Sequence, residues 1–115
     1  MAVSNRPWGE ISESDYPSPA AFCSACLIDE NEPGADKVKS NCKLPVREPG
    51  GALNRNGVHA AAQRLSATQA SPAAKAAAAR KLVRLYGELK EDPPESVSRM
   101  AHQQINEAIR RAASR

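Results

Sequence analysis

The residues best suited to chemistry are three cysteines and one histidine. They are Cys23 and Cys26, which form a C-x-x-C, and the single residues Cys42 and His59. Three thiols and an imidazole are the ligand types of a structural zinc site, but strong zinc patterns pair two close doublets, and here the second doublet is missing. The pattern therefore favours buried, reduced thiols without a metal. It leaves open a zinc site and a disulfide between Cys26 and Cys42 in a mature extracellular particle.

No spacing of residues predicts catalysis. His59 and His102 fall in expected helices, without a serine, aspartate or cysteine at a spacing that would form a catalytic relay. The carboxylates gather in expected loops, and the sequence contains no glycine-rich motif that cradles phosphate groups. We therefore expect no enzymatic activity and no cofactor.

The composition bounds the fold. The chain has 115 residues, the size of one small domain. Valine, leucine, isoleucine and phenylalanine together number 18, whereas alanine alone numbers 21. Because this composition supplies little large apolar surface, we expect an alanine-rich helical fold with a thin core, better ordered in an assembly than alone.

Charge is distributed unevenly along the chain. Residues 1–36 carry seven acidic side chains and one basic side chain, whereas residues 37–115 carry fifteen basic and six acidic side chains. An acidic part beside a basic part suits docking on a charged protein or nucleic-acid surface, although solvated helix faces produce the same distribution.

No apolar run approaches the roughly 20 residues that cross a bilayer, and the N-terminal part lacks the basic start and apolar stretch of a signal peptide. The odd number of cysteines also differs from the even sets of small secreted proteins. We therefore expect synthesis in a cytoplasm and no membrane partner.

Residues 1–7 are expected to form a flexible arm in front of a small helical domain over residues 8–92. Trp8 is the only tryptophan of the chain. Its large ring has two interpretations, a side chain that fills a gap in the core and an anchor that binds a partner.

Residues 18–37 begin with a helix signal and end in a loop signal. Ser18 and Pro19 are typical of a helix cap and a first helical position, so PAAFCSACLI is expected as a short helix. A strand over FCSACLID is the alternative. The acidic stretch DENEPGADK that follows contains proline and glycine, which predicts a polar loop.

The stretch NCKLPVREPGGALN, residues 41–54, predicts an extended segment and a turn. Cys42, Leu44 and Val46 alternate with polar residues or proline, which is the period of a strand with one buried face. Pro45 lacks an N–H donor and restricts pairing to a sheet edge. Leu44 and Val46 are expected to pack beneath two helices. The helical residues expected to cover them are Val58, Leu65, Leu82 and Leu85.

Two helices are predicted after this segment. Asn54 or Asn56 suits the cap of a helix over residues 56–67. The pair Ser71–Pro72 begins the strongest helical pattern of the chain, residues 72–91. Because the connection between them is short, we expect an antiparallel helical hairpin and a mainly α fold.

A C-terminal amphipathic helix is expected over residues 95–113, after an Asp-Pro-Pro break. Its apolar stripe includes Val97, Met100, Ile105 and Ile109. An uncovered stripe would bind a partner, whereas a stripe folded back would add a third member to a helical bundle. The four residues are, with Trp8, the candidate partner-binding positions.

The helix expected over residues 72–91 has a basic face. It is formed by Lys75, Arg80, Lys81, Arg84 and Lys90. The face suits phosphate contacts, but it lacks interleaved aromatic residues, and the sequence contains no recognised DNA-binding motif. Nucleic-acid binding is therefore an alternative and not the leading interpretation.

Three stretches resemble a module encoded among the structural genes of tailed bacteriophages and prophages. They are RPW near the start, KxxCKLPVREPGGALNRNGVHAAAQRL, and PAAKAAAARKLVRLYGEL. The likeness covers roughly residues 5–92 and does not extend to the C-terminal helix. Such modules occur as small separate proteins and fused to capsid maturation proteases or other head proteins.

This resemblance implies a role in the virion or in head assembly, and no catalytic residue carries over, because protease activity belongs to the fused partner. We interpret the chain as a non-enzymatic minor capsid or decoration (cement) protein, made in the bacterial cytoplasm, that binds the major capsid protein and stabilises the head. The alternatives are a small nucleic-acid-binding packaging or regulatory protein and a scaffold-like assembly factor. Self-association before attachment also stays open.

Overall fold

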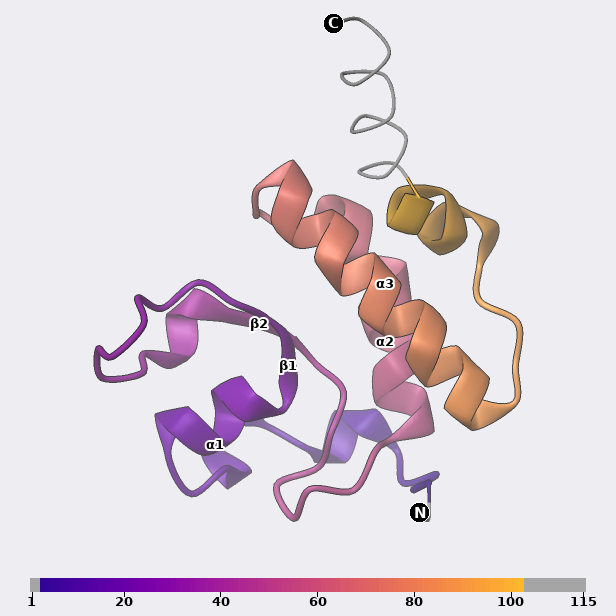
Figure 1. The fold of residues 1–115 in the computed structure, drawn as a ribbon. Coiled ribbons are helices and arrows are strands. Elements are labelled where there is room, and N and C mark those ends of the chain that lie inside the picture. Colours follow the sequence, from indigo (N-terminus) through magenta and orange to yellow (C-terminus); the bar gives the residue numbers. More distant parts are fainter. Residues whose placement is uncertain (1–2, 103–115) are drawn as a thin grey trace, which may run out of the picture.

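The computed structural model describes residues 3–102 and shows a mixed fold (Figure 1). Helices account for 54% of these residues and strands and bridges for 12%, and a two-stranded antiparallel sheet shares the core with the helices. The expected mainly α fold built on a helical hairpin is therefore wrong. The two helices do pack together, but the sheet, a disulfide and a short N-terminal helix belong to the same small domain.

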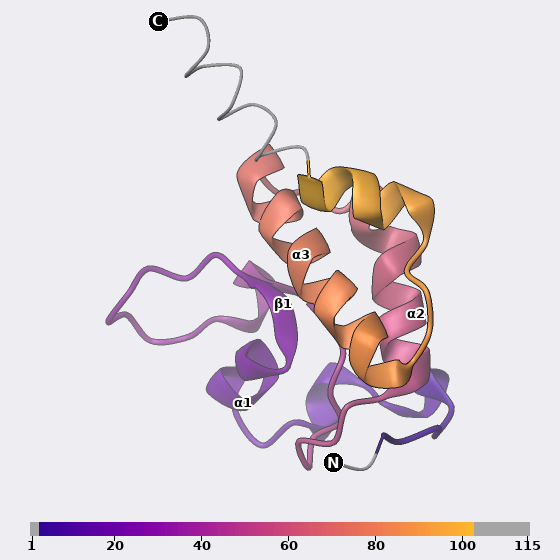
Figure 2. The ribbon, with the colours of Figure 1, turned by 45° about the vertical axis from the view of Figure 1, so that its right-hand side comes forward.

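The main elements are α1 (Pro19–Ser24), β1 (Cys26–Asp29), β2 (Cys42–Pro45), α2 (Arg55–Arg64) and α3 (Pro72–Leu89). Short 3-10 helices cover Trp8–Glu10, Glu13–Asp15, Lys39–Asn41 and Leu65–Ala67. A further helix begins at residue 95 and continues to residue 102, where the described part ends. Figures 1 and 2 show α1 and the sheet on one side of the molecule and α2, α3 and this last helix on the other.

The three predicted helix starts are confirmed by their caps. The side-chain oxygen of Ser18 accepts a hydrogen bond from the Ala21 N–H (3.1 Å), and that of Ser71 accepts one from the Ala74 N–H (3.1 Å). Of the two asparagines considered for α2, Asn54 is the cap. These signals are local, since each cap satisfies a free N–H within its own first turn.

Residues 19–28 form a helix followed by a strand, not one helix. After Ser24 the chain turns, and the Ala25 carbonyl accepts a hydrogen bond from the Val46 N–H (2.9 Å). β1 then pairs antiparallel with β2, with Ile28 opposite Lys43. Pairing with β2, which is distant in sequence, thus determines the secondary structure of this segment. The strand alternative is correct for its second half.

The main core lies between the sheet and the helices. As expected, Leu44 and Val46 belong to one buried cluster with residues of α2, of the 3-10 helix Leu65–Ala67 that follows α2, and of α3. The cluster includes Val58, Leu65 and Leu82, with Leu85 partly buried against it. Leu44 adopts a left-handed backbone conformation, with φ of +64°. A second, smaller cluster lies between α1 and β2 and contains Tyr16, Phe22, Cys23, Ala25 and Cys42.

The N-terminal residues lie along the start of α2. The Ser4 N–H donates to the Leu53 carbonyl (2.8 Å), and the Arg55 N–H donates to the Ser4 carbonyl (2.9 Å). The Asn56 side chain donates to the carbonyls of Asn5 and Arg6. The described part of the segment expected as a flexible arm is therefore fixed by backbone hydrogen bonds.

Within residues 3–102, no helix combines the length and the apolar character needed to cross a membrane.

Candidate functional site

Two of the three cysteines form a disulfide, Cys23 to Cys42, with Cα atoms 5.3 Å apart. The favoured expectation of reduced thiols is therefore wrong, and so is the alternative that was left open, a Cys26–Cys42 disulfide. The sheet register explains the difference, because Cys26 pairs with Pro45, three residues from Cys42, and three strand residues span roughly 10 Å. A disulfide needs Cα atoms about 4.4 to 6.8 Å apart. Cys23 meets that condition from α1, which packs against β2.

Cys26 is the free cysteine and is half-buried. Burial, together with the smaller effect of the nearby charges of Glu13 and Asp29, raises the pKa of its thiol to about 12. At neutral pH the side chain is a protonated thiol, which is a poor nucleophile and a poor metal ligand.

The four residues considered for zinc are not brought together. A carboxylate oxygen of Asp29 lies within 4.8 Å of the sulfurs of Cys23 and Cys42, but these sulfurs are bonded to each other and supply no thiolate. His59 lies on α2 and contacts Glu91 instead. With the disulfide formed, residues 3–102 contain no complete set of zinc ligands.

Asn31 ties the loop between β1 and β2 to the disulfide. Its Nδ2 donates to Asp29 Oδ1 (2.8 Å) and to Cys42 Sγ (3.2 Å), and its Oδ1 accepts from the Val38 N–H (2.9 Å). These bonds connect both ends of the loop to the smaller core. Sequence reasoning missed Asn31, because its partners lie up to 11 residues away and no motif marks them.

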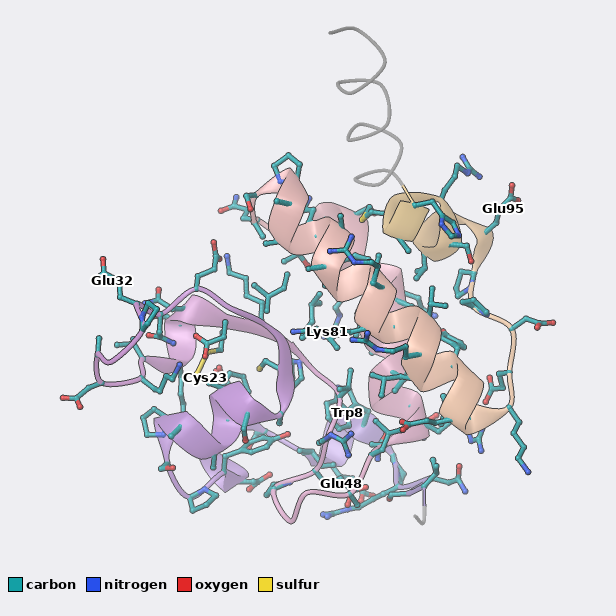
Figure 3. All side chains as sticks on the ribbon, in the orientation of Figure 1. Trp8, Cys23, Glu32, Glu48, Lys81 and Glu95 are labelled. Atoms are coloured by element: carbon teal, nitrogen blue, oxygen red, sulfur yellow. A yellow bond between two sulfur atoms is a disulfide. The ribbon has the colours of Figure 1, made fainter. Side chains whose placement is uncertain are left out.

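The loop over residues 30–38, here called the acidic loop, projects from the body of the molecule, with Glu32 at its far end (Figures 1 and 3). Asp29 at its base pairs with Lys37 (2.7 Å). The hydrogen bond from Lys37 is the main cause that lowers the Asp29 pKa to about 2, and bonds from Asn31 add to it. Within residues 3–102, Glu32 and Asp36 take part in no ion pair.

A groove of about 330 Å³ lies between the start of β1 and the second half of α3. We call it the basic groove. Its apolar lining includes Leu27, Val46 and Leu85, together with the thiol of Cys26. Its charged lining consists of Arg47, Lys81, Arg84 and Glu88. Figure 3 shows Lys81 between the sheet side and the helical side of the molecule. The groove thus combines a few apolar side chains with charged side chains that are predominantly positive.

The basic face expected on α3 is partly used within the fold. Lys81 Nζ donates to the Leu27 carbonyl (3.1 Å), and Lys75 Nζ donates to the Ser66 carbonyl (2.9 Å). Each bond holds α3 to a neighbouring segment. Arg84 is exposed beside the groove, and sequence reasoning missed that Arg47, from the hairpin after β2, lies near it.

His59, Arg55 and Glu91 form a cluster where α2 meets the end of α3. His59 Nε2 lies 2.8 Å from Glu91 Oε1, and Arg55 pairs with the other carboxylate oxygen. The hydrogen bond with His59 is the largest cause that lowers the Glu91 pKa. The His59 ring stacks on Tyr86, with centroids 5.8 Å apart. Among residues 3–102 no hydroxyl or thiol is hydrogen-bonded to His59, so the cluster has the character of a structural clamp.

Trp8 packs on the first turn of α2. A Cβ placed at Gly57 would lie 3.0 Å from three carbons of the Trp8 ring, so the ring covers this glycine closely. Trp8 is half-buried. It packs within the chain but belongs to neither buried cluster, so both interpretations of Trp8 stay predictions.

The described start of the C-terminal helix packs on the core. Val97 is 1% exposed and Ala101 is buried, and Met100 packs against the same cluster. These contacts favour the alternative in which the helix folds back on the domain. Ile105 and Ile109, the other candidate positions, lie outside the described residues.

Comparisons with family models, with curated proteins and with solved structures found no match for this chain.

Proposed function

We propose that this chain is a non-enzymatic structural protein of a tailed-phage head, a minor capsid or decoration protein that attaches to the major capsid protein. The stretches that resemble the phage module include β2, the turn after it, and helices α2 and α3, which together build the main core. The resemblance therefore rests on residues that fold as one unit.

The observation that carries the proposal is the acidic loop. It projects from the domain, and the Cys23–Cys42 disulfide and Asn31 fix its base (Figure 1). Val38, the last residue of the loop, is 49% exposed. Among residues 3–102 it is the only large hydrophobic side chain that is exposed. A prearranged loop loses little conformational entropy on docking, so a small protein can attach through it at many equivalent sites of a lattice.

The disulfide also suits a virion protein. A bacterial cytoplasm keeps thiols reduced, whereas a particle released from the cell meets oxidising conditions. A head protein made in the cytoplasm would acquire the Cys23–Cys42 bond in the released particle, where it would stabilise the loop that contacts the shell.

Nucleic-acid binding has weaker support. Two lysines of the α3 basic face donate to backbone carbonyls of the chain itself, which restrains them. The acidic loop would also repel phosphate groups.

The test is a binding assay on heads assembled from the major capsid protein of the phage that encodes this chain. Purified wild-type chain should sediment with expanded heads in many copies per particle. The double variant Glu32→Lys/Asp36→Lys should sediment less, because it reverses the charge of the projecting loop. Sedimentation only with immature heads would indicate an assembly factor, and no binding to either form would refute the proposal.

Salt-dependent binding to non-specific DNA is the measurement for the alternative. Phosphate contacts predict strong binding at low salt that falls steeply as salt rises. No DNA binding at low salt would remove the alternative.

A further inference from the structure

The basic groove has the size and chemistry of a docking site for a short acidic segment. Its volume of about 330 Å³ accommodates a few side chains, and Leu27, Val46 and Leu85 add apolar groups to a mainly polar lining. Arg47, Lys81 and Arg84 line it against the single carboxylate of Glu88, so its lining has a positive net charge. Carboxylates that enter such a groove gain charge-assisted hydrogen bonds, and an apolar side chain beside them gains contact area.

The acidic loop of the same chain carries the complementary groups. Glu32 and Asp36 are exposed and have no ion-pair partner within residues 3–102. Val38, two residues after Asp36 in the same loop, is 49% exposed. The loop thus presents two carboxylates and one apolar side chain, which matches a groove that has a positive net charge and some apolar side chains.

We propose that the basic groove binds the acidic loop of a second copy of this chain, in a head-to-tail contact. The loop cannot reach the groove of its own chain, because it projects away from the helices and the disulfide and Asn31 fix its base (Figure 1). Loop and groove are different surfaces, so a dimer keeps one free loop and one free groove, and the contact can repeat from copy to copy.

A second copy fits the groove better than a nucleic acid does. A phosphate backbone would place a charge at every step beside Glu88 and would leave Leu85 without an apolar partner. The acidic loop offers separated carboxylates and one valine.

The test uses two charge-reversal variants of the full chain. The loop variant Glu32→Lys/Asp36→Lys keeps an intact groove, and the groove variant Arg84→Glu keeps an intact loop. Sedimentation is measured at low ionic strength over a series of protein concentrations. The wild type should associate, and the dissociation constant of each variant alone should be at least about tenfold higher. An equal mixture of the two variants should form one-to-one dimers and no larger species, because it contains one functional pair of surfaces.

The variant Arg80→Glu is the matched control. It makes the same charge change on the same helix, but Arg80 does not line the groove, so its association should equal that of the wild type. Thermal melts establish that every variant is folded. Cys26 lines the groove, and its alkylation at alkaline pH should slow on association of the wild type.

Two results would overturn the proposal: a wild type that stays monomeric at low ionic strength over the whole series, or a mixture of folded variants that associates no better than either alone. Both proposals use the acidic loop, which contacts one partner at a time, so the head-to-tail contact is measured without capsid. A failure of the head-to-tail contact would not refute capsid binding. A failure to bind heads would not refute the head-to-tail contact.

Discussion

The ring of Trp8 covers Gly57 so closely that a Cβ at residue 57 would lie 3.0 Å from three ring carbons. Glycine in a helix normally costs about 0.5 to 1 kcal/mol relative to alanine. Here the absence of a side chain allows the N-terminal segment to lie against the first turn of α2.

The first prediction follows from this contact. Gly57→Ala should destabilise the wild type by about 1 kcal/mol, because the ring has to shift, whereas in a Trp8→Ala background it should stabilise the fold by about 0.5 to 1 kcal/mol. Urea unfolding of the four variants of this cycle measures both effects. The same sign in both backgrounds would show that the ring does not constrain residue 57.

Asn54 is completely buried and joins three segments. Its Oδ1 accepts from the Gly57 N–H (2.8 Å), and its Nδ2 donates to the Arg6 carbonyl (3.0 Å) and to Glu48 Oε2 (2.8 Å). Asn54→Ala should cost about 2 to 3 kcal/mol in unfolding free energy, since it removes a helix cap and leaves buried groups unpaired.

Asn54→Asp separates the two roles of this side chain. It keeps the cap acceptor but loses both donors and places a carboxylate beside Glu48, so its stability should recover as pH is lowered. The exposed neighbour variant Asn56→Ala should cost less than Asn54→Ala. Equal losses for the two alanine variants would mean that burial of Asn54 contributes little.

The disulfide provides the third prediction. Cys23 and Cys42 are 19 residues apart, and closing a loop of this length stabilises a fold by about 3 kcal/mol in the chain-entropy account. Reduction, or the Cys23→Ser/Cys42→Ser variant, should lower unfolding free energy by about that amount. Cys26→Ser is the control and should respond to reductant as the wild type does. A non-reducing peptide map that links Cys26 to either cysteine would contradict the pairing.

Asp29 makes a pH prediction. Its folded pKa of about 2 lies below the ordinary value of 3.8, mainly because Lys37 hydrogen-bonds to it. The ionised carboxylate therefore contributes stability that is fully present above pH 3.8 and is lost as pH falls toward about 2. The wild type should be more stable than Asp29→Asn near neutral pH, and the difference should vanish over this window.

Urea unfolding at a series of pH values measures that difference. Asp36→Asn is the control. Asp36 lies in the acidic loop next to Lys37 and has no ion pair within residues 3–102. A constant difference between wild type and Asp29→Asn at all pH values would show that the Lys37 pair does not stabilise the fold.

Val97 tests the place of the last described helix. The residue is 1% exposed and belongs to the main core, so Val97→Ala should cost about 1 to 3 kcal/mol. Arg99→Ala changes an exposed residue of the same helix and should cost little. Equal and small effects in thermal melts would mean that this helix contributes little to the stability of the domain.

Local signals predicted the helices well, and contacts between distant residues explain what was missed. The caps Ser18, Asn54 and Ser71 act within one turn, so sequence reasoning placed all three helix starts. β1 is only four residues long, and its pairing with β2 depends on residues far along the chain. The same register separates Cys26 from Cys42, which rules out the disulfide that the sequence had left open as an alternative.

The candidate surfaces were harder to predict. The basic groove combines Arg47 from the hairpin after β2 with Arg84 from α3, and no periodicity connects these residues. The sequence also did not predict the burial of Val97, because the two prolines before the helix do not indicate whether it packs on the core. The apolar stripe itself was visible, but its partner was not.

The left-handed backbone of Leu44 restricts which amino acids can occupy this position during evolution. Glycine and asparagine adopt a φ of +64° easily but leave the core unfilled, whereas valine and isoleucine fill it but resist that conformation. A complete mutational scan should therefore find few tolerated residues at position 44, with unbranched methionine among the best. Sequence change at this position would be slow whatever the protein binds, so a leucine retained here among homologues would reflect folding and not recognition.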